Sequence, residues 1–418
     1  MHGTLVPRSS LSRQTTRRAM HASEIVARVV GPCLKCLHKR RQAALLRVVT
    51  GLLGANASSL SAIALHLGGR AAFKHRFKSV DRLLGNSAFH HGRDQLYRSV
   101  AAQWLEGLQQ LLVVVDWSDA TQDQRWHLLR ASAVVEGRSI TLYEEIHPQA
   151  RYGHPSVHRA FMQKLALIVP AGCKLIVMTD AGFHAPWFKL VVAHGWEFVG
   201  RIRGRNLLRL QAQGAWIAAR DLFARAKLEA ADLGTGTYAR SNPVSVRITL
   251  AARPGKGRHR LNMHGKRRVG RSSAKSARSG REPWLLASSA GLQHLRASAI
   301  VALYAQRMRI EQSFRDTKNL RVGMGLEVAR SRSAARLQML LLIAHLAMFV
   351  QRLIGESARA AQLELFLSAT QNRRYAEVSV LTLGRRILDI APEYLKRLRP
   401  WCALDLLNQQ ARAALAPR

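Results

Sequence analysis

The chain has 418 residues and carries 65 Lys and Arg against 25 Asp and Glu, a formal net charge of +40. Hydrophobic residues make up 48% of the sequence, enough to bury the cores of two or three domains, which excludes a disordered basic tail or a collagen-like polymer. Because so large a charge excess repels itself in a compact fold, we expect a polyanionic partner. Nucleic acid is the expected partner, and a membrane surface is the alternative.

The first 80 residues are strongly basic, with 14 Lys and Arg and a single acid. We expect residues 1–40 to be a flexible basic leader, because no apolar segment follows its first arginines. Residues 41–105 are expected to form a helical DNA-binding domain, although a bundle with a solvated basic face is the alternative. The expected helices of this domain cover 43–53, 60–67 and 73–86. Its expected DNA-contacting cations are Arg76, Lys78 and Arg82.

Four cysteines are too few for a disulfide framework in a chain of this length, so we expect a reducing compartment and a cytoplasmic, nucleoid-associated protein. Cys33 and Cys36 form a lone C-x-x-C pair, and a zinc site would need a second pair. The most apolar stretch, 337–350, is shorter than the roughly 18 residues that cross a bilayer. We therefore expect it to be a buried core helix, and no membrane partner.

After residue 105 the pattern changes from helix to strand. A helix over 92–112 leads into three apolar runs, at 111–115, 126–135 and 139–146, that predict consecutive antiparallel strands. The elements expected next are a helix over 158–167, a strand over 174–179, a helix over 186–194 and a strand over 197–203. Antiparallel strands followed by alternating helices and strands predict an α/β fold with a mixed sheet.

The segment from residue 204 to about 291 is less regular and more basic. Short strands are expected at 244–250 and 284–287. Between Arg253 and Arg281 there are eleven Lys and Arg and no acid, which indicates a disordered basic loop or a β-rich insertion along a phosphate backbone. From residue 298 onward the pattern is helical, and we expect 346–418 to be a C-terminal helical region that could dimerise.

Two aspartates follow strongly apolar strands, Asp116 and Asp180. Ligands meet an open α/β sheet at such positions, although a lone Asp there also serves as a turn or helix cap. Glu311 is the third acid of interest. It shares a segment with Tyr304, Arg307 and Lys318, at spacings that put all four side chains on one face of a helix. The alternative is a solvated face held by salt bridges one turn apart.

Three carboxylates brought together repel one another unless a cation lies between them. Hard divalent ions with oxygen ligands, Mg²⁺ or Mn²⁺, suit such a cluster. Two such ions activate a nucleophile and stabilise the leaving oxygen in phosphodiester displacement. The acids thus suggest that the polyanion is a substrate.

The segment around Glu311 resembles the signature of a large group of bacterial insertion-sequence transposases: Tyr, two residues, Arg, three residues, Glu, six residues, Lys. This sequence matches it without a gap. The likeness extends to 77–86, 115–118, 178–183 and 379–385, and covers nearly the whole chain after residue 40. It implies an RNase H-like catalytic domain over 106–345, interrupted by a β-rich insertion at about 204–291 and flanked by N-terminal and C-terminal helical regions. Many members have Arg after the second Asp, where this chain has Ala181.

The resemblance also implies roles for individual residues. Asp116, Asp180 and Glu311 would form the DDE triad and hold Mg²⁺, with Mn²⁺ as a substitute. The residues implied to grip phosphates near the scissile bond are Tyr304, Arg307 and Lys318. Trp284 matches a residue that stacks on a flipped base at a DNA hairpin, unless it is a core aromatic. Arg201 and Arg203 match DNA contacts, unless they form a solvated strand face.

The expected function is that of a cut-and-paste transposase. It would bind terminal inverted repeats of double-stranded DNA, pair two ends as a homodimer, nick them and join them to target DNA. One alternative is a catalytically silent DNA-binding derivative that acts as an inhibitor. Another is an RNase H-like nuclease without strand transfer.

Overall fold

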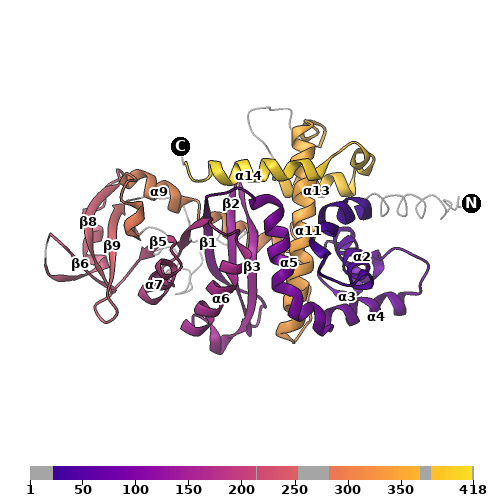
Figure 1. Ribbon diagram of the computed structural model, residues 1–418, viewed down its shortest axis with the longest axis horizontal. Coiled ribbons are helices and arrows are strands. Elements are labelled where there is room, and N and C mark those ends of the chain that lie inside the picture. The colour runs from indigo at the N-terminus through magenta and orange to yellow at the C-terminus, as the bar shows by residue number, and fades with distance from the viewer. Residues whose placement is uncertain (1–21, 213, 253–281, 368–377, 417–418) are drawn as a thin grey trace, which may run out of the picture.

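The computed structural model describes residues 22–212, 214–252, 282–367 and 378–416. Within these ranges ten strands form one mixed sheet, in the order β3-β2-β1-β4-β5-β10-β9-β8-β6-β7. Figure 1 shows β6, β8 and β9 at one end of the molecule and helices α2 to α4 at the other. The expected α/β class is confirmed.

The first half of the sheet has the strand order of an RNase H-like core. Its strands are β1 (Gln110–Asp119), β2 (Trp126–Val135), β3 (Arg138–Pro148), β4 (Lys174–Thr179) and β5 (Glu197–Ile202). The first three pair antiparallel, and β4 pairs parallel with both β1 and β5. Parallel neighbours need a crossover, which α6 (Pro155–Ile168) and α7 (Ala185–Ala193) provide.

The insertion does not fold as a separate sheet but extends this one. Its strands are β6 (Leu207–Leu210), β7 (Trp216–Ala218), β8 (Ala231–Tyr238), β9 (Val244–Ala251) and β10 (Trp284–Ser288). Strand β10 pairs antiparallel with β5, with Leu286 opposite Arg201. The expected strands at 244–250 and 284–287 are thus confirmed, and the basic run 253–281 lies outside the described residues.

Helices cover both faces of the core strands. Neighbouring residues of a strand point to opposite faces, and so Trp117 bonds to His158 of α6 while Asp116 bonds to Arg307 beside α10 (Met308–Lys318). The other C-terminal α-helices are α9 (Ala297–Ala305), α11 (Ala334–Ala360), the short α12 (Glu364–Leu367), α13 (Val380–Asp389) and α14 (Ala403–Ala413). Helix α11 is long and apolar enough to cross a membrane. However, 89% of its most apolar stretch is buried inside the protein, as expected of a core helix.

The N-terminal helices are α2 (Lys39–Ala55), α3 (Leu60–His66), α4 (Phe73–Leu84) and α5 (Ser87–Leu105), and the first three match the predicted ones. Ser59 caps α3, because its side chain accepts a hydrogen bond from the Ala62 N–H. The helix expected over 92–112 is wrong at its end. It stops at Leu105, and Gly107 then takes a positive φ of 72° that turns the chain into β1.

The expected flexible leader over 1–40 is too long. Residues 22–30 are helical and a 3-10 helix follows at Gly31–Leu34, while 1–21 lie outside the described residues. Ile25, Val26 and Val29 form one buried face. Cys33 is buried as well, and burial raises its pKa to about 12. The C-x-x-C pair is therefore split between the core and the exposed Cys36.

Candidate active site

The register of the parallel strands brings the two predicted aspartates together. Val115 of β1 lies opposite Thr179 of β4, and the next residues are Asp116 and Asp180. Asp116 does not follow its strand, as the sequence suggested, but lies inside it, because β1 continues in pairing with β2 as far as Asp119. The Asp180 carboxylate accepts a bond from the Gly182 N–H at 2.8 Å, which fixes the turn after β4.

Arg307 bridges the first acid and the third. Its Nη1 donates to Asp116 Oδ2 at 2.8 Å, and its Nη2 donates to Glu311 Oε1 at 3.0 Å. The side chains of Arg307 and Asp116 are 14% and 13% exposed, and that of Glu311 is 43% exposed. One guanidinium thus holds together two acids that are far apart in sequence.

Negative charge is in excess around Arg307. Burial, and then the charge of Asp180, raise the pKa of Asp116 to about 7 against the opposing effect of Arg307. The carboxylates of Asp116, Asp180 and Glu311 supply negative charge and oxygen ligands, which suits a hard divalent cation. Within the described residues, however, no three His, Cys, Asp or Glu side chains are arranged to hold a metal ion. A guanidinium lies between two of the acids instead.

Lys318 anchors the C-terminal end of α10 to β1. Its Nζ donates to the Ser118 hydroxyl and, at 2.7 Å, to the Asp119 carbonyl. Burial lowers the pKa of Lys318 to about 8. Arg307 and Lys318 therefore tie both ends of α10 to β1.

The four signature residues do not lie on one continuous helix. Helix α9 ends at Ala305 and α10 begins at Met308. Between them the Arg307 N–H bonds to the Tyr304 carbonyl at 3.0 Å, a contact three residues back that tightens the turn. Arg307, Glu311 and Lys318 face the same cleft, whereas Tyr304 lies on α9 and is buried.

Trp284 packs against Tyr304. Their ring centroids are 4.8 Å apart and the ring planes meet at 86°, an edge-to-face contact. Trp284 is 8% exposed and Tyr304 is 2% exposed. This is the position of a core aromatic rather than of a side chain open to a flipped base.

Arg201 and Arg203 are both engaged by the segment before β10. Arg203 Nε donates to the Glu282 carboxylate at 2.7 Å, and Arg201 Nη2 donates to the Glu282 carbonyl at 3.2 Å. The expected solvated or DNA-facing strand surface is therefore partly neutralised by an acid of the chain itself.

The predicted cations of α4 divide into two kinds. Arg76 Nη1 donates to the Leu67 carbonyl at 3.0 Å and so holds the end of α3. Lys78 and Arg82 are exposed on the surface of α4. Arg76 is therefore engaged within the fold, whereas Lys78 and Arg82 face solvent.

The acids line a cleft of about 540 Å³ together with Arg307 and Lys318. The cleft residues that were not predicted include Phe314, Arg315, Asn319 and Glu327. Arg315 lies four residues after Glu311 on the same helical face, so its spacing was a usable signal. Another missed feature is Tyr152, which is 51% exposed and whose ring centroid lies 5.0 Å from that of Trp117. No spacing in the sequence connects those two rings.

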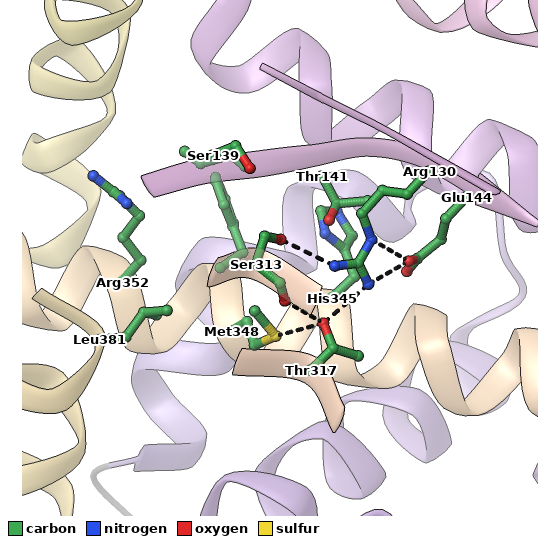
Figure 2. Close-up of a pocket in the computed structure, with 12 residues that line it drawn as sticks. Arg130, Ser139, Thr141, Glu144, Ser313, Thr317, His345, Met348, Arg352 and Leu381 are labelled. Atoms are coloured by element: carbon green, nitrogen blue, oxygen red, sulfur yellow. Dashed lines mark hydrogen bonds and ion pairs between the residues drawn. The ribbon is translucent and has the colours of Figure 1, made fainter. Parts of the chain in front are cut away.

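A buried cluster supports α10 from beneath (Figure 2). Arg130 Nε donates to Glu144 Oε2 at 2.8 Å, and its Nη atoms donate to Ser313 Oγ at 3.0 Å and Thr317 Oγ1 at 2.9 Å. Tyr97 donates to the other oxygen of Glu144 at 3.0 Å. Because Ser313 and Thr317 lie on α10, the cluster fixes the helix that carries Glu311 and Lys318.

A comparison with protein families adds an independent finding. A family model described as a transposase DDE domain matches residues 108–349, more than half of the chain, and the match includes Asp116, Asp180 and Glu311. A search of curated proteins finds no match. The matched range begins just before β1 and ends within α11, so it spans the core strands, the insertion and α10. The chain therefore belongs to the DDE transposase family.

Proposed function

We propose that this protein catalyses cut-and-paste transposition of an insertion sequence. It binds terminal inverted repeats, cleaves the DNA there and joins the freed 3′ ends to target DNA. The observation that carries the proposal is that Asp116, Asp180 and Glu311 line one cleft although they come from β1, the end of β4 and α10.

Asp116, Asp180 and Glu311 would hold Mg²⁺, which when bound polarises the scissile phosphate and lowers the pKa of water. In the first reaction a water oxygen bonds to phosphorus and the bond to the 3′ oxygen breaks, which leaves a 3′-hydroxyl. In the second, that hydroxyl bonds to a target phosphorus and displaces a 3′ oxygen of the target. Arg307 and Lys318 would hold the non-bridging phosphate oxygens during both displacements.

In this scheme Arg307 pairs either with the carboxylates of the cleft or with the scissile phosphate. Without DNA it pairs with Asp116 and Glu311. A scissile phosphate offers it a stronger, bidentate partner. Transfer of the guanidinium to the phosphate would leave both carboxylates to the metal, which couples metal binding to substrate binding.

Helix α4 is the proposed DNA-recognition element. Lys74, Lys78 and Arg82 are spaced four residues apart on it and all three are exposed. That spacing places them along one face of the helix, where they can contact consecutive phosphates or base edges.

Pairing of two DNA ends requires two copies of the chain. Three apolar residues near α13 are exposed to solvent: Leu365 (42% exposed), Phe366 (78%) and Ile390 (69%). We propose this surface as the homodimer contact on DNA, in a nucleoid-associated complex. Light scattering of the DNA complex should give two chains for wild type and one for Phe366→Glu.

The test of the proposed function uses a plasmid that carries the DNA flanking this reading frame. With Mg²⁺ or Mn²⁺, the wild-type protein should cleave at the ends and join them to a second plasmid. Glu311→Ala should abolish both reactions, while Glu393→Ala, an exposed acid near the C-terminus, should leave them unchanged. Cleavage without joining would identify a nuclease. Binding without cleavage would identify a silent, inhibitory derivative.

A further inference from the structure

A second and larger groove lies next to the cleft of the three acids. It has a volume of about 1160 Å³ and lies between the start of α3, helix α4 and the segment 327–336 that leads into α11. Glu327 lines both the groove and the cleft, so the two hollows adjoin. A ligand longer than one nucleotide could occupy both.

The groove is rich in guanidinium and hydroxyl groups. The residues that supply them include Arg330, Arg332, Arg336, Ser59, Ser61 and Ser333. Arg336 pairs with Asp81 of α4. Arg330 and Arg332 are exposed, and within the described ranges neither has an acidic partner. Two arginines are thus available to an anion from outside.

The three arginines and four serines of the lining favour an anionic ligand and set the groove apart from an ordinary small-molecule pocket. Such pockets measure roughly 300–1,000 Å³ and are mostly apolar, with a few polar groups. Arginine and serine side chains are instead the common contacts of DNA phosphates, which position a duplex without reading its sequence.

The groove has fixed walls. The Ser58 hydroxyl, beside α3, donates to the Met324 carbonyl at 2.7 Å. The Arg336 and Asp81 pair joins the start of α11 to α4. The Glu327 carboxylate accepts the Leu320 N–H at 2.6 Å, so the acid at the boundary of the two hollows is already engaged. A preformed groove of this kind binds its ligand at a lower entropic cost.

We propose that this groove is a phosphate-backbone site for duplex DNA, in which Arg330 and Arg332 grip the duplex between the part bound by α4 and the scissile bond at Asp116, Asp180 and Glu311. The inference rests on the proposed function and deepens it. It assigns the segment 327–336 as the link between recognition and cleavage.

The test is DNA binding by the full-length chain in EDTA, which prevents cleavage. The probe is a fluorescently labelled duplex of mixed sequence, since phosphate contacts are independent of sequence. Arg330→Ala/Arg332→Ala should weaken binding by roughly tenfold for each arginine. The slope of log affinity against log salt should fall by about 1 for each arginine. Arg330→Lys/Arg332→Lys should keep most of the slope, because it keeps the charge.

The matched control is Arg397→Ala/Arg399→Ala, which removes two exposed arginines near the C-terminus. This control should retain the wild-type dependence of affinity on salt. If the control lost as much affinity and slope as the groove variant, net charge alone would explain the effect and the groove site would be overturned. Unchanged DNA binding by the groove variant, with a changed oligomeric state in size-exclusion chromatography, would assign the groove to a second copy instead. A wild-type chain that binds no duplex would overturn both the groove and the proposed function. Normal wild-type binding with an unaffected groove variant would overturn the groove alone.

Discussion

The inner and outer sides of α10 carry two arginine clusters of opposite character. Inside, Arg130 and Glu144 are each 1% exposed, and the remaining donors of Arg130 bond to hydroxyls on α10. Outside, Arg307 faces Asp116 and Glu311, with the charge of Asp180 close enough to raise the pKa of Asp116.

The difference lies in the charge balance. The inner cluster has one cation and one acid with their hydrogen bonds made, so it has nothing to gain from a ligand. In the outer cluster Arg307 alone pairs with the acids, since Lys318 bonds to β1 instead, and the cluster opens into a cleft, so it gains from a divalent ion. Changes inside should therefore cost stability, and changes outside should cost activity.

The largest expected effect is that of Asp116→Asn on DNA cleavage. The amide keeps the shape but loses the charge that would hold Mg²⁺, a loss of several kcal/mol of transition-state stabilisation and on the order of 10³-fold in rate. The free energy of unfolding in urea should change by less than about 1 kcal/mol, because surplus negative charge is removed. A stability loss equal to the activity loss would contradict the comparison.

The next effect is that of Arg130→Met on stability. Removal of one partner from a buried ion pair leaves Glu144 uncompensated and should cost about 3–5 kcal/mol, measured by urea unfolding. Arg130→Met/Glu144→Met should recover much of the loss, because no charge is left buried. The outer counterpart, Arg307→Met, should cost less, about 1–2 kcal/mol, because its partner Glu311 is partly exposed and its cleft is open to water. Equal losses for the two arginines would show that the clusters do not differ.

A smaller effect is expected for Arg307→Gln on metal binding. Without the guanidinium between Asp116 and Glu311, Mn²⁺ should bind the DNA-free protein roughly tenfold more tightly, about the strength of one partly buried charge interaction. Calorimetry measures this directly, and DNA cleavage should fall at the same time. Arg315→Gln is the matched control, an exposed arginine of the same cleft. Unchanged Mn²⁺ affinity in Arg307→Gln would show that Arg307 does not compete with the ion.

Patterns within short segments predicted much of the outer cluster. The apolar runs before Asp116 and Asp180 and the spacing of Arg307, Glu311 and Lys318 are local features, and parallel pairing then places both aspartates at one edge of the sheet. The roles of these residues stay predictions until they are tested by mutation.

The inner cluster could not be predicted, because its contacts join distant segments. Arg130 meets Ser313 across 183 residues, and no periodicity records that pairing. The same holds for the edge-to-face contact of Trp284 with Tyr304. Helix propensity also fails to predict the break between α9 and α10 at Arg307, because the two acids that hold the Arg307 side chain lie on different elements.

The smallest expected effect joins the two clusters. Thr317→Val keeps the shape of α10 but removes one hydrogen-bond acceptor of Arg130 Nη2. Because this nitrogen still pairs with Glu144 Oε2 at 2.6 Å, the free energy of unfolding should fall by only about 1 kcal/mol. If the inner cluster positions the cleft, cleavage should nevertheless fall by roughly tenfold, because small displacements of reacting groups are costly. Mn²⁺ affinity should fall with it. Thr249→Val, a buried threonine of β9 whose hydroxyl makes no hydrogen bond within the described residues, should leave cleavage unchanged. A Thr317→Val protein with wild-type cleavage would separate the two clusters and reduce the inner one to a contribution to stability.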